Sequence, residues 1–392
     1  MHSDPVESIM PSNVKLQDMI IESRRDFLKR LGAISAMLVV GRNGLTIFAA
    51  GGSTPFELLV IGDSVIWGQG LPEKDKFYTH TANWLRNEAF GKSREVNLKV
   101  KAHSGSTLKF HPDEAEKYKK AGRDETYYYK PEVNVGFPSS YKQIEVAADE
   151  YRNAGKQGAD LIMICGGITD ISTSQVYNPK GNDDELRRLI KQYCRDHMFE
   201  VLELAVSKNP NAKLAVIGYF PAITSKTLSS KILNDWQEAL GVGGFKKALT
   251  NNPIVRPLFF NKLRKRAIVR SAIWCEESDK NLREAVVMIN AKYGHNRAVF
   301  VKSPLTEDNA AEAPDTKLFT MGKGGVVNDP MAWERIKDCR EALPVLKRDT
   351  GIDYPVRLCE IAAVGHPDPA GARAYAEAIK TAVGPLLKET NR

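Results

Sequence analysis

A serine near the start of the chain and a histidine near its end could supply a nucleophile and a base. Ser64 lies in the stretch Gly62-Asp63-Ser64, directly after the apolar run 56–61, and His366 lies close to the last helical stretch of the chain. A serine hydroxyl is a weak nucleophile until a neighbouring imidazole takes its proton. The two residues can therefore perform covalent chemistry only if the fold brings together distant parts of the sequence.

Two further polar stretches follow apolar runs in the same way as Ser64. Ser104-Gly105-Ser106 comes after the run 96–102, and Gly167-Ile168-Thr169-Asp170 comes after the run 161–165. Ligands collect at the carboxyl ends of the strands in open α/β sheets, so these stretches are expected to lie around Ser64. The simpler alternatives are a strand-to-helix turn with a capping serine at Ser64 and a helix-capping threonine at Thr169.

From residue 54 onward, short apolar runs alternate with stretches of helical periodicity, which is typical of a parallel sheet covered on both faces. The sequence therefore predicts an α/β fold, a three-layer α/β/α sandwich with a parallel sheet of about five strands. The strands are expected at 56–61, 96–102, 161–165, 214–220 and 298–301, and the helices at 77–90, 141–154, 184–207, 281–292 and 370–388.

Three long segments interrupt this alternation, at about 109–138, 221–275 and 305–347, the last with a predicted helix at 331–346. Each follows a strand, so each is expected to rise over the edge where Ser64 lies and to act as a lid or specificity element. The second contains the basic and aromatic stretch 256–274. That stretch could contact an anionic membrane peripherally, or form a lid on an acidic or lipid substrate. The favoured alternative is a helical cap with a packed inner face.

The first 53 residues have the features of an export signal. Residues 23–29 read SRRDFLK, the twin-arginine pattern, and an apolar segment follows at 31–40 before small residues at 49–52. That segment is too short to span a bilayer but suits a signal-peptide core. The sequence thus predicts a signal peptide and short linker over 1–53, a domain over 54–392, export by the twin-arginine translocase, and a periplasmic or secreted location.

Composition and charge narrow the function classes. The 392-residue chain is 42% apolar and 27% charged, with a net charge of +8, which slightly favours anionic surfaces or substrates. No nucleic-acid-binding signature is present. The five cysteines form no C-x-x-C pair, so no metal site is expected. Export makes a disulfide possible, and Cys339 and Cys359 are the closest pair, although sequence does not fix the pairing.

The fourth polar stretch along the chain is His366-Pro367-Asp368-Pro369-Ala370-Gly371. In this order, the four stretches resemble the SGNH (GDSL-type) hydrolase family of esterases and lipases. The resemblance runs from about 56 to 388, with the three long segments as insertions. It implies a flavodoxin-like fold and ester hydrolysis through an acyl-enzyme, with no metal or organic cofactor. By its motifs, Ser64 is the nucleophile and His366 the general base, while Ser64, Gly105 and Thr169 form the oxyanion hole.

The chain departs from the family pattern at two positions. Thr169 stands where the family has asparagine, and a hydroxyl is a shorter donor than an amide. Ala363 stands where the family has its acid, three residues before His366. Glu360, Asp353 or a backbone carbonyl could orient the histidine instead, and the carbonyl would leave a Ser–His dyad.

The sequence gives weaker evidence for the roles of other residues near these four stretches. Asp368 is interpreted as the N-cap of the last helix, and Asp63 and Asp170 as structural acids that accept hydrogen bonds from loop amides. His103 could approach the site or be a satisfied buried residue, and Trp67 could line the pocket or the core.

Two rival functions stay open. One is a catalytically silent relative that binds carbohydrate or lipid, which the residues at positions 169 and 363 favour. The other is a specialised enzyme, either a lipase or phospholipase at a membrane or a polysaccharide O-deacetylase.

Overall fold

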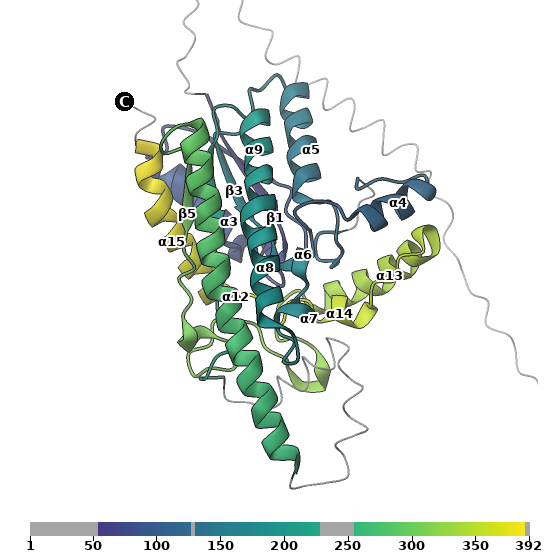
Figure 1. The fold of residues 1–392 in the computed structure, drawn as a ribbon. Coiled ribbons are helices and arrows are strands. Elements are labelled where there is room, and N and C mark those ends of the chain that lie inside the picture. Colours follow the sequence, from purple (N-terminus) through teal and green to yellow (C-terminus); the bar gives the residue numbers. More distant parts are fainter. Residues whose placement is uncertain (1–53, 127–129, 228–254, 389–392) are drawn as a thin grey trace, which may run out of the picture. The chain divides into compact units, whose positions relative to one another are not determined.

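Parallel strands form the centre of the structure (Figure 1). The sheet has five strands in the order β2-β1-β3-β4-β5. This order is that of a flavodoxin-like, doubly wound sheet. The computed structural model describes residues 54–126, 130–227 and 255–388, so the twin-arginine stretch lies outside the described residues. The strands are β1 (Phe56–Gly62), β2 (Val96–Val100), β3 (Leu161–Cys165), β4 (Lys213–Ile217) and β5 (Ala298–Val301).

Burial explains why the strands could be found in the sequence. β1 and β3 are buried along their whole length, so they lack the alternation of a half-exposed strand and read as continuous apolar runs. β2 and β4 end earlier than expected, at Val100 and Ile217. The apolar residues beyond these ends belong to segments that leave the sheet toward the site, which the sequence pattern does not separate from the strand.

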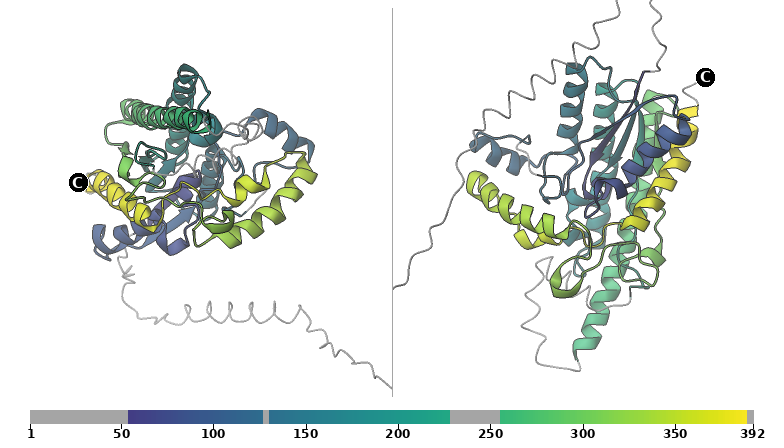
Figure 2. Two further views of the ribbon diagram at one scale, coloured as in Figure 1. Left: turned by 90° about the horizontal axis from the view of Figure 1, so that it is seen from below. Right: turned by 180° about the vertical axis from the view of Figure 1, so that it is seen from behind.

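Helices cover both faces of the sheet, which confirms the three-layer architecture (Figure 2). α3 (Phe77–Trp84) and α15 (Pro369–Lys388) pack together on one face, whereas α5 (Ser140–Asn153) and α9 (Met198–Lys208) pack together on the other. α8 (Asp183–Lys191) joins α9 through a π-helical segment at Gln192–His197, so the helix expected at 184–207 is present with an internal widening.

The helix expected at 281–292 is much longer than predicted. α12 runs without a break over Val255–Tyr293 and packs against α8, α9 and β5. It therefore includes the basic stretch 256–274, whose part beyond residue 261 buries Leu263, Ala267 and Trp274. These residues give that part the packed inner face of a helical cap. Membrane contact through this stretch stays a prediction.

A smaller lobe stands beside the sandwich. α4 (Pro112–Lys120), α13 (Ala332–Thr350) and α14 (Val356–Glu360) enclose a second apolar core, and the Cys339–Cys359 disulfide joins α13 to α14. The core consists of Tyr118, Val133, Val135, Phe137, Cys339, Leu343, Leu346, Ile352 and Cys359. Among the described helices, none is both long and apolar enough to cross a membrane.

Candidate active site

Ser64 is placed by a tight turn between β1 and the short helix α2 (Ser64–Trp67). Gly62 has a φ of 125°, and a Cβ there would lie 1.9 Å from the carbonyl oxygen of Cys165, so the turn requires glycine. Asp63 caps α2, because its Oδ1 accepts a hydrogen bond of 2.9 Å from the N–H of Val65. In the described part of the chain the N–H of Ser64 has no acceptor.

His366 meets Ser64 at the carboxyl edge of the sheet. Its Nε2 lies 2.7 Å from Ser64 Oγ. Two backbone hydrogen bonds to Phe319 hold the histidine loop, with Phe319 N donating to His366 O at 2.8 Å and Gly365 N donating to Phe319 O at 2.9 Å. Asp368 accepts from two N–H groups in the first turn of α15 at 2.8 and 2.9 Å, which confirms its expected role as N-cap.

The far nitrogen of the imidazole has no orienting partner. His366 Nδ1 is buried, and no hydrogen bond to it forms from any described residue. Glu360 accepts hydrogen bonds from two arginines, and the carboxylate of Asp353 pairs with a lysine. Neither carboxylate is hydrogen-bonded to the ring, so of the three alternatives left open by the sequence, the structure does not favour these two. The backbone carbonyl groups of residues 362–364 lie near the ring and favour its protonated form, but none of them forms a hydrogen bond with Nδ1. The contacts present are therefore those of a Ser–His dyad.

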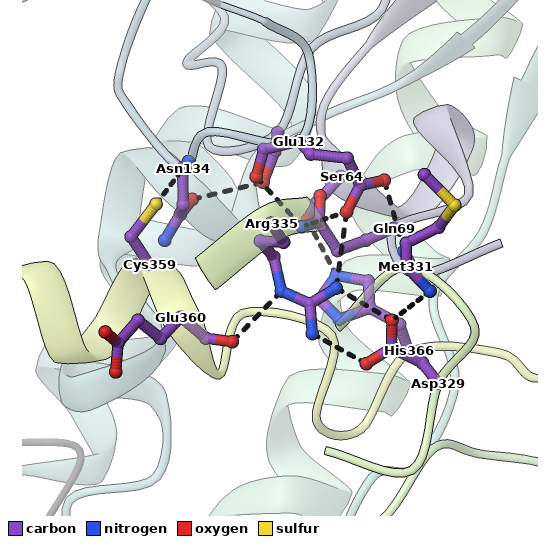
Figure 3. Close-up of polar contacts among 12 residues, drawn as sticks. Ser64, Gln69, Glu132, Asn134, Asp329, Met331, Arg335, Cys359, Glu360 and His366 are labelled. Atoms are coloured by element: carbon purple, nitrogen blue, oxygen red, sulfur yellow. Dashed lines mark hydrogen bonds and ion pairs between the residues drawn. The ribbon is translucent and has the colours of Figure 1, made fainter. Parts of the chain in front are cut away.

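A buried arginine lies beside the histidine (Figure 3). Arg335 is fully buried and donates to Asp329 at 2.9 and 2.6 Å, to Glu132 at 3.3 Å and to the carbonyl of Glu360 at 3.0 Å. Burial and the charge of Arg335 together lower the pKa of His366 to about 4. The ring is therefore neutral at ordinary pH, which is the form that can accept a proton.

The stretch Ser104-Gly105-Ser106 brings Gly105 to the same edge of the sheet. Its φ is 80°, and a Cβ would lie 2.4 Å from Asn134 Oδ1 and 2.7 Å from the carbonyl oxygen of Val135. Glycine is needed for both reasons. No described residue accepts from the N–H of Gly105, nor from the side-chain amide of Asn134. Asn134 is a cavity residue that the sequence did not indicate, since it lies within an insertion.

Gln143 on α5 connects the stretch Gly62-Asp63-Ser64 to the stretch Ser104-Gly105-Ser106. Its Oε1 accepts from Gly62 N at 2.7 Å, and its Nε2 donates to Ser106 Oγ at 2.9 Å and to Gly62 O at 3.2 Å. This buried amide therefore fixes the Gly105 loop relative to Ser64. Its position on a predicted helix gave no signal for such a role.

Asp63 and Asp170 have the structural roles expected from sequence. Besides capping α2, Asp63 accepts a hydrogen bond of 2.6 Å from Tyr219, and burial raises the pKa of its carboxyl group. Asp170 accepts from Leu108 N at 3.1 Å, and burial raises the pKa of Asp170 to about 7. Both side chains connect loops around the site.

Thr169 lies inside α6 (Ile168–Ile171), where Gly167 occupies the N-cap, so the capping alternative for Thr169 is wrong. Its hydroxyl donates to the carbonyl of Ser106 at 2.5 Å. The single hydroxyl hydrogen is therefore in use in this structure. As an oxyanion donor, Thr169 would have to turn away from Ser106.

A cavity of about 410 Å³ opens at this edge and includes Ser64, His366, Gly105 and Thr169 in its wall. The first and second insertions, α14 and the segment before α14 also border it, through His111, Glu114, Asn134, Trp274, Leu358 and Tyr354. Trp67 and His103 do not line the cavity. Trp67 donates to Glu132 at 2.9 Å, and His103 Nδ1 lies 2.9 Å from the carbonyl of Ser104. No cluster of metal-ligating side chains is found among the described residues.

Comparisons with known proteins give distant likenesses. No family model matches the chain, and no curated protein matches it. An extracellular lipase from Streptomyces rimosus is 14% identical with a TM-score of 0.41, covering 83% of this chain and 99% of its own. A phospholipase A1 from Streptomyces albidoflavus is 11% identical, with a TM-score of 0.39 and coverage of 83% and 99%. A Clostridium thermocellum family 3 carbohydrate esterase is 11% identical, with a TM-score of 0.37 and coverage of 86% and 99%.

Proposed function

We propose that this protein hydrolyses an ester bond through an acyl-enzyme formed on Ser64. The observation that carries the proposal is the 2.7 Å contact between Ser64 Oγ and His366 Nε2 at the wall of a cavity. The neutral imidazole and the N–H groups of Ser64 and Gly105, which have no acceptor among the described residues, support it. These are the components that acyl transfer requires: a nucleophile, a base and donors for an oxyanion.

The proposed reaction has two halves. Ser64 Oγ attacks the ester carbonyl carbon while its proton moves to His366 Nε2. The N–H groups of Ser64 and Gly105, and the Thr169 hydroxyl if it turns, stabilise the oxyanion. The C–O bond to the alcohol then breaks, and the alcohol leaves with the proton from His366. Water attacks the acyl-serine, gives its proton to His366, and the acid departs as Ser64 regains the proton.

The environment of His366 favours a second candidate, a silent relative that binds an ester or glycan without turnover. Nδ1 is buried with no hydrogen-bond partner among the described residues, and the adjacent Arg335 opposes the positive charge that the ring must carry during acyl transfer. A binder would show ligand affinity but no covalent labelling of Ser64 by a fluorophosphonate.

Turnover of p-nitrophenyl acetate tests the proposal. The purified domain should hydrolyse it, Ser64→Ala should abolish hydrolysis and fluorophosphonate labelling, and Thr173→Ala should retain both. Thr173 is the matched control because it carries another hydroxyl at the wall of the same cavity. Equal rates for the parent protein and the Ser64 variant would overturn the assignment.

We also propose that residues 1–53 direct export of the folded protein through the twin-arginine pathway. The twin-arginine pattern followed by the apolar segment supports this. In cell fractionation, the parent chain should reach the periplasm or medium, and a chain with Arg24→Lys and Arg25→Lys should stay inside. Unchanged export of the variant would refute the pathway.

A further inference from the structure

We infer that the cavity selects uncharged or cationic esters over anionic ones, and that Glu114 is the residue that determines this preference. The inference rests on the proposed ester hydrolysis and adds the class of substrate. It runs against the net charge of +8, which by itself favours anionic ligands.

The charge at the cavity wall differs from that of the whole chain. Among the described residues that line the cavity, Glu114 is the only carboxylate, and neither lysine nor arginine is present. The carboxylate is anchored, since Tyr354 donates a 2.9 Å hydrogen bond to it. Tyr354 is itself held by Gly136 N, which donates to its hydroxyl at 3.2 Å. Glu114 is therefore a fixed negative charge at the wall and not a freely moving surface side chain.

Basic residues near the site do not offset this charge, because they are already paired. Arg335, beside His366, pairs with Asp329 and Glu132. Lys76 pairs with Glu73 and is also attracted by the charge of Glu132. On α12, two other basic side chains, Arg266 and Arg270, pair with Asp183 away from the cavity wall. An anionic substrate group would find no lysine or arginine among the described wall residues, where His111 and His366 are the only basic side chains.

Aromatic rings strengthen the same preference. Tyr177, Tyr219, Phe220, Trp274 and Tyr354 all line the cavity. The face of an aromatic ring carries partial negative charge, which attracts cations and gives no stabilisation to a carboxylate or phosphate. An anion would also lose hydration on entering this wall. Uncharged acyl or alcohol groups suffer neither penalty.

Two pairs of matched esters test the inference. In the first pair the acyl group differs in charge: p-nitrophenyl butyrate against p-nitrophenyl hydrogen succinate. In the second the alcohol differs: phenyl acetate against 4-carboxyphenyl acetate. Each kcat/KM is normalised to the rate of alkaline hydrolysis of the same ester. The variants are Glu114→Gln and the control Glu116→Gln, which lies on the same helix but is exposed and pairs with Lys120.

The parent protein should disfavour the anionic member of at least one pair by about ten-fold, from a fixed unit charge within several ångströms at an intermediate dielectric constant. Glu114→Gln should remove most of that gap, Glu116→Gln should leave it unchanged, and added salt should narrow it in the parent. The inference is overturned if the parent shows no gap in either pair, or if the gap survives in Glu114→Gln.

Binding separates this inference from the proposed reaction. The same esters, titrated into Ser64→Ala and followed by the fluorescence of tryptophan, including Trp274 at the cavity wall, report affinity without turnover. A protein with no esterase activity that still prefers the uncharged esters, and loses that preference with Glu114→Gln, would refute the reaction and retain the charge selectivity. Equal affinity for both members of each pair would refute the selectivity whatever the activity.

Discussion

The proposed ester hydrolysis should continue at a pH where an ordinary histidine is already protonated. The reason is the environment of His366, where burial and the neighbouring Arg335 lower the pKa of the ring to about 4. A base must be neutral to accept the proton of Ser64, so the acid limb of kcat/KM reports the pKa of this ring in the free enzyme. We therefore expect the acid limb to fall near pH 4 and not near pH 6.5.

The size of the effect follows from the neutral fraction of the ring. With a pKa of about 4, roughly nine-tenths of His366 is neutral at pH 5. With an unperturbed pKa of about 6.5, only about 3% would be neutral. At pH 5, the fraction of the plateau kcat/KM that remains should thus be about 30-fold higher than it would be with an unperturbed histidine.

A pH profile of kcat/KM with phenyl acetate provides the measurement, with the Ser64→Ala protein as background. Asp170 is buried nearby, and its raised pKa of about 7 could add a second inflection. Asp170→Asn removes that titration, since an amide oxygen can still accept from Leu108 N. An acid limb centred near pH 6.5 in both proteins would refute the reasoning.

Stability must be followed in the same experiment, because the lowered pKa of His366 also links folding to pH. As pH falls below about 6.5, the unfolded chain takes up a proton that the folded ring does not accept until about pH 4. The stabilisation from the neutral ring is therefore complete above about pH 6.5 and declines toward pH 4. Circular dichroism at each pH separates loss of catalysis from loss of fold.

Three further variants give distinct outcomes. Gly105→Ala should lower kcat about a hundred-fold in the esterase assay, because the added Cβ displaces a loop that carries a proposed oxyanion donor; unchanged kcat would exclude that role. Thr169→Val should cost about 1 kcal/mol in urea unfolding and less than ten-fold in kcat, since its hydroxyl donates to Ser106; a hundred-fold loss of kcat would instead indicate an oxyanion donor. Cys339→Ser with Cys359→Ser should cost about 3 kcal/mol, from a sequence separation of 20 residues, and calorimetry should show a lower Tm; an unchanged Tm would contradict it.

The sheet and its coverage could be predicted because they depend on local patterns. β1 and β3 are continuous apolar runs since they are buried on both faces, and α15 shows helical periodicity since Tyr375, Ile379 and Val383 face the core. The length of α12 could not be predicted in the same way. Basic residues interrupt its apolar pattern, and burial of Arg270 against backbone carbonyls depends on the segment 175–182, which only tertiary packing brings there.

In the candidate site, too, the residues that follow strands could be predicted from the sequence, and those placed by tertiary packing could not. Gly62, Ser64 and Gly105 stand directly after strands, so the parallel sheet alone brings them to one edge. The surroundings of His366 come from α13, α14 and the insertion after β2, whose paths the sequence does not specify. Arg335 and Glu132 are far apart in the chain and meet only through the second core, so no spacing rule could pair them.

The small lobe links the base to the cavity wall. α13 carries Arg335, and α14 carries Glu360, whose carbonyl accepts from Arg335 at 3.0 Å shortly before the chain reaches His366. The same lobe places Tyr354 against Glu114. Because the disulfide ties α13 to α14, a movement of this lobe would shift the charge beside the imidazole and the charge at the cavity wall together. We therefore expect substitutions in the core of this lobe to change both the pH profile and the preference between charged and uncharged esters.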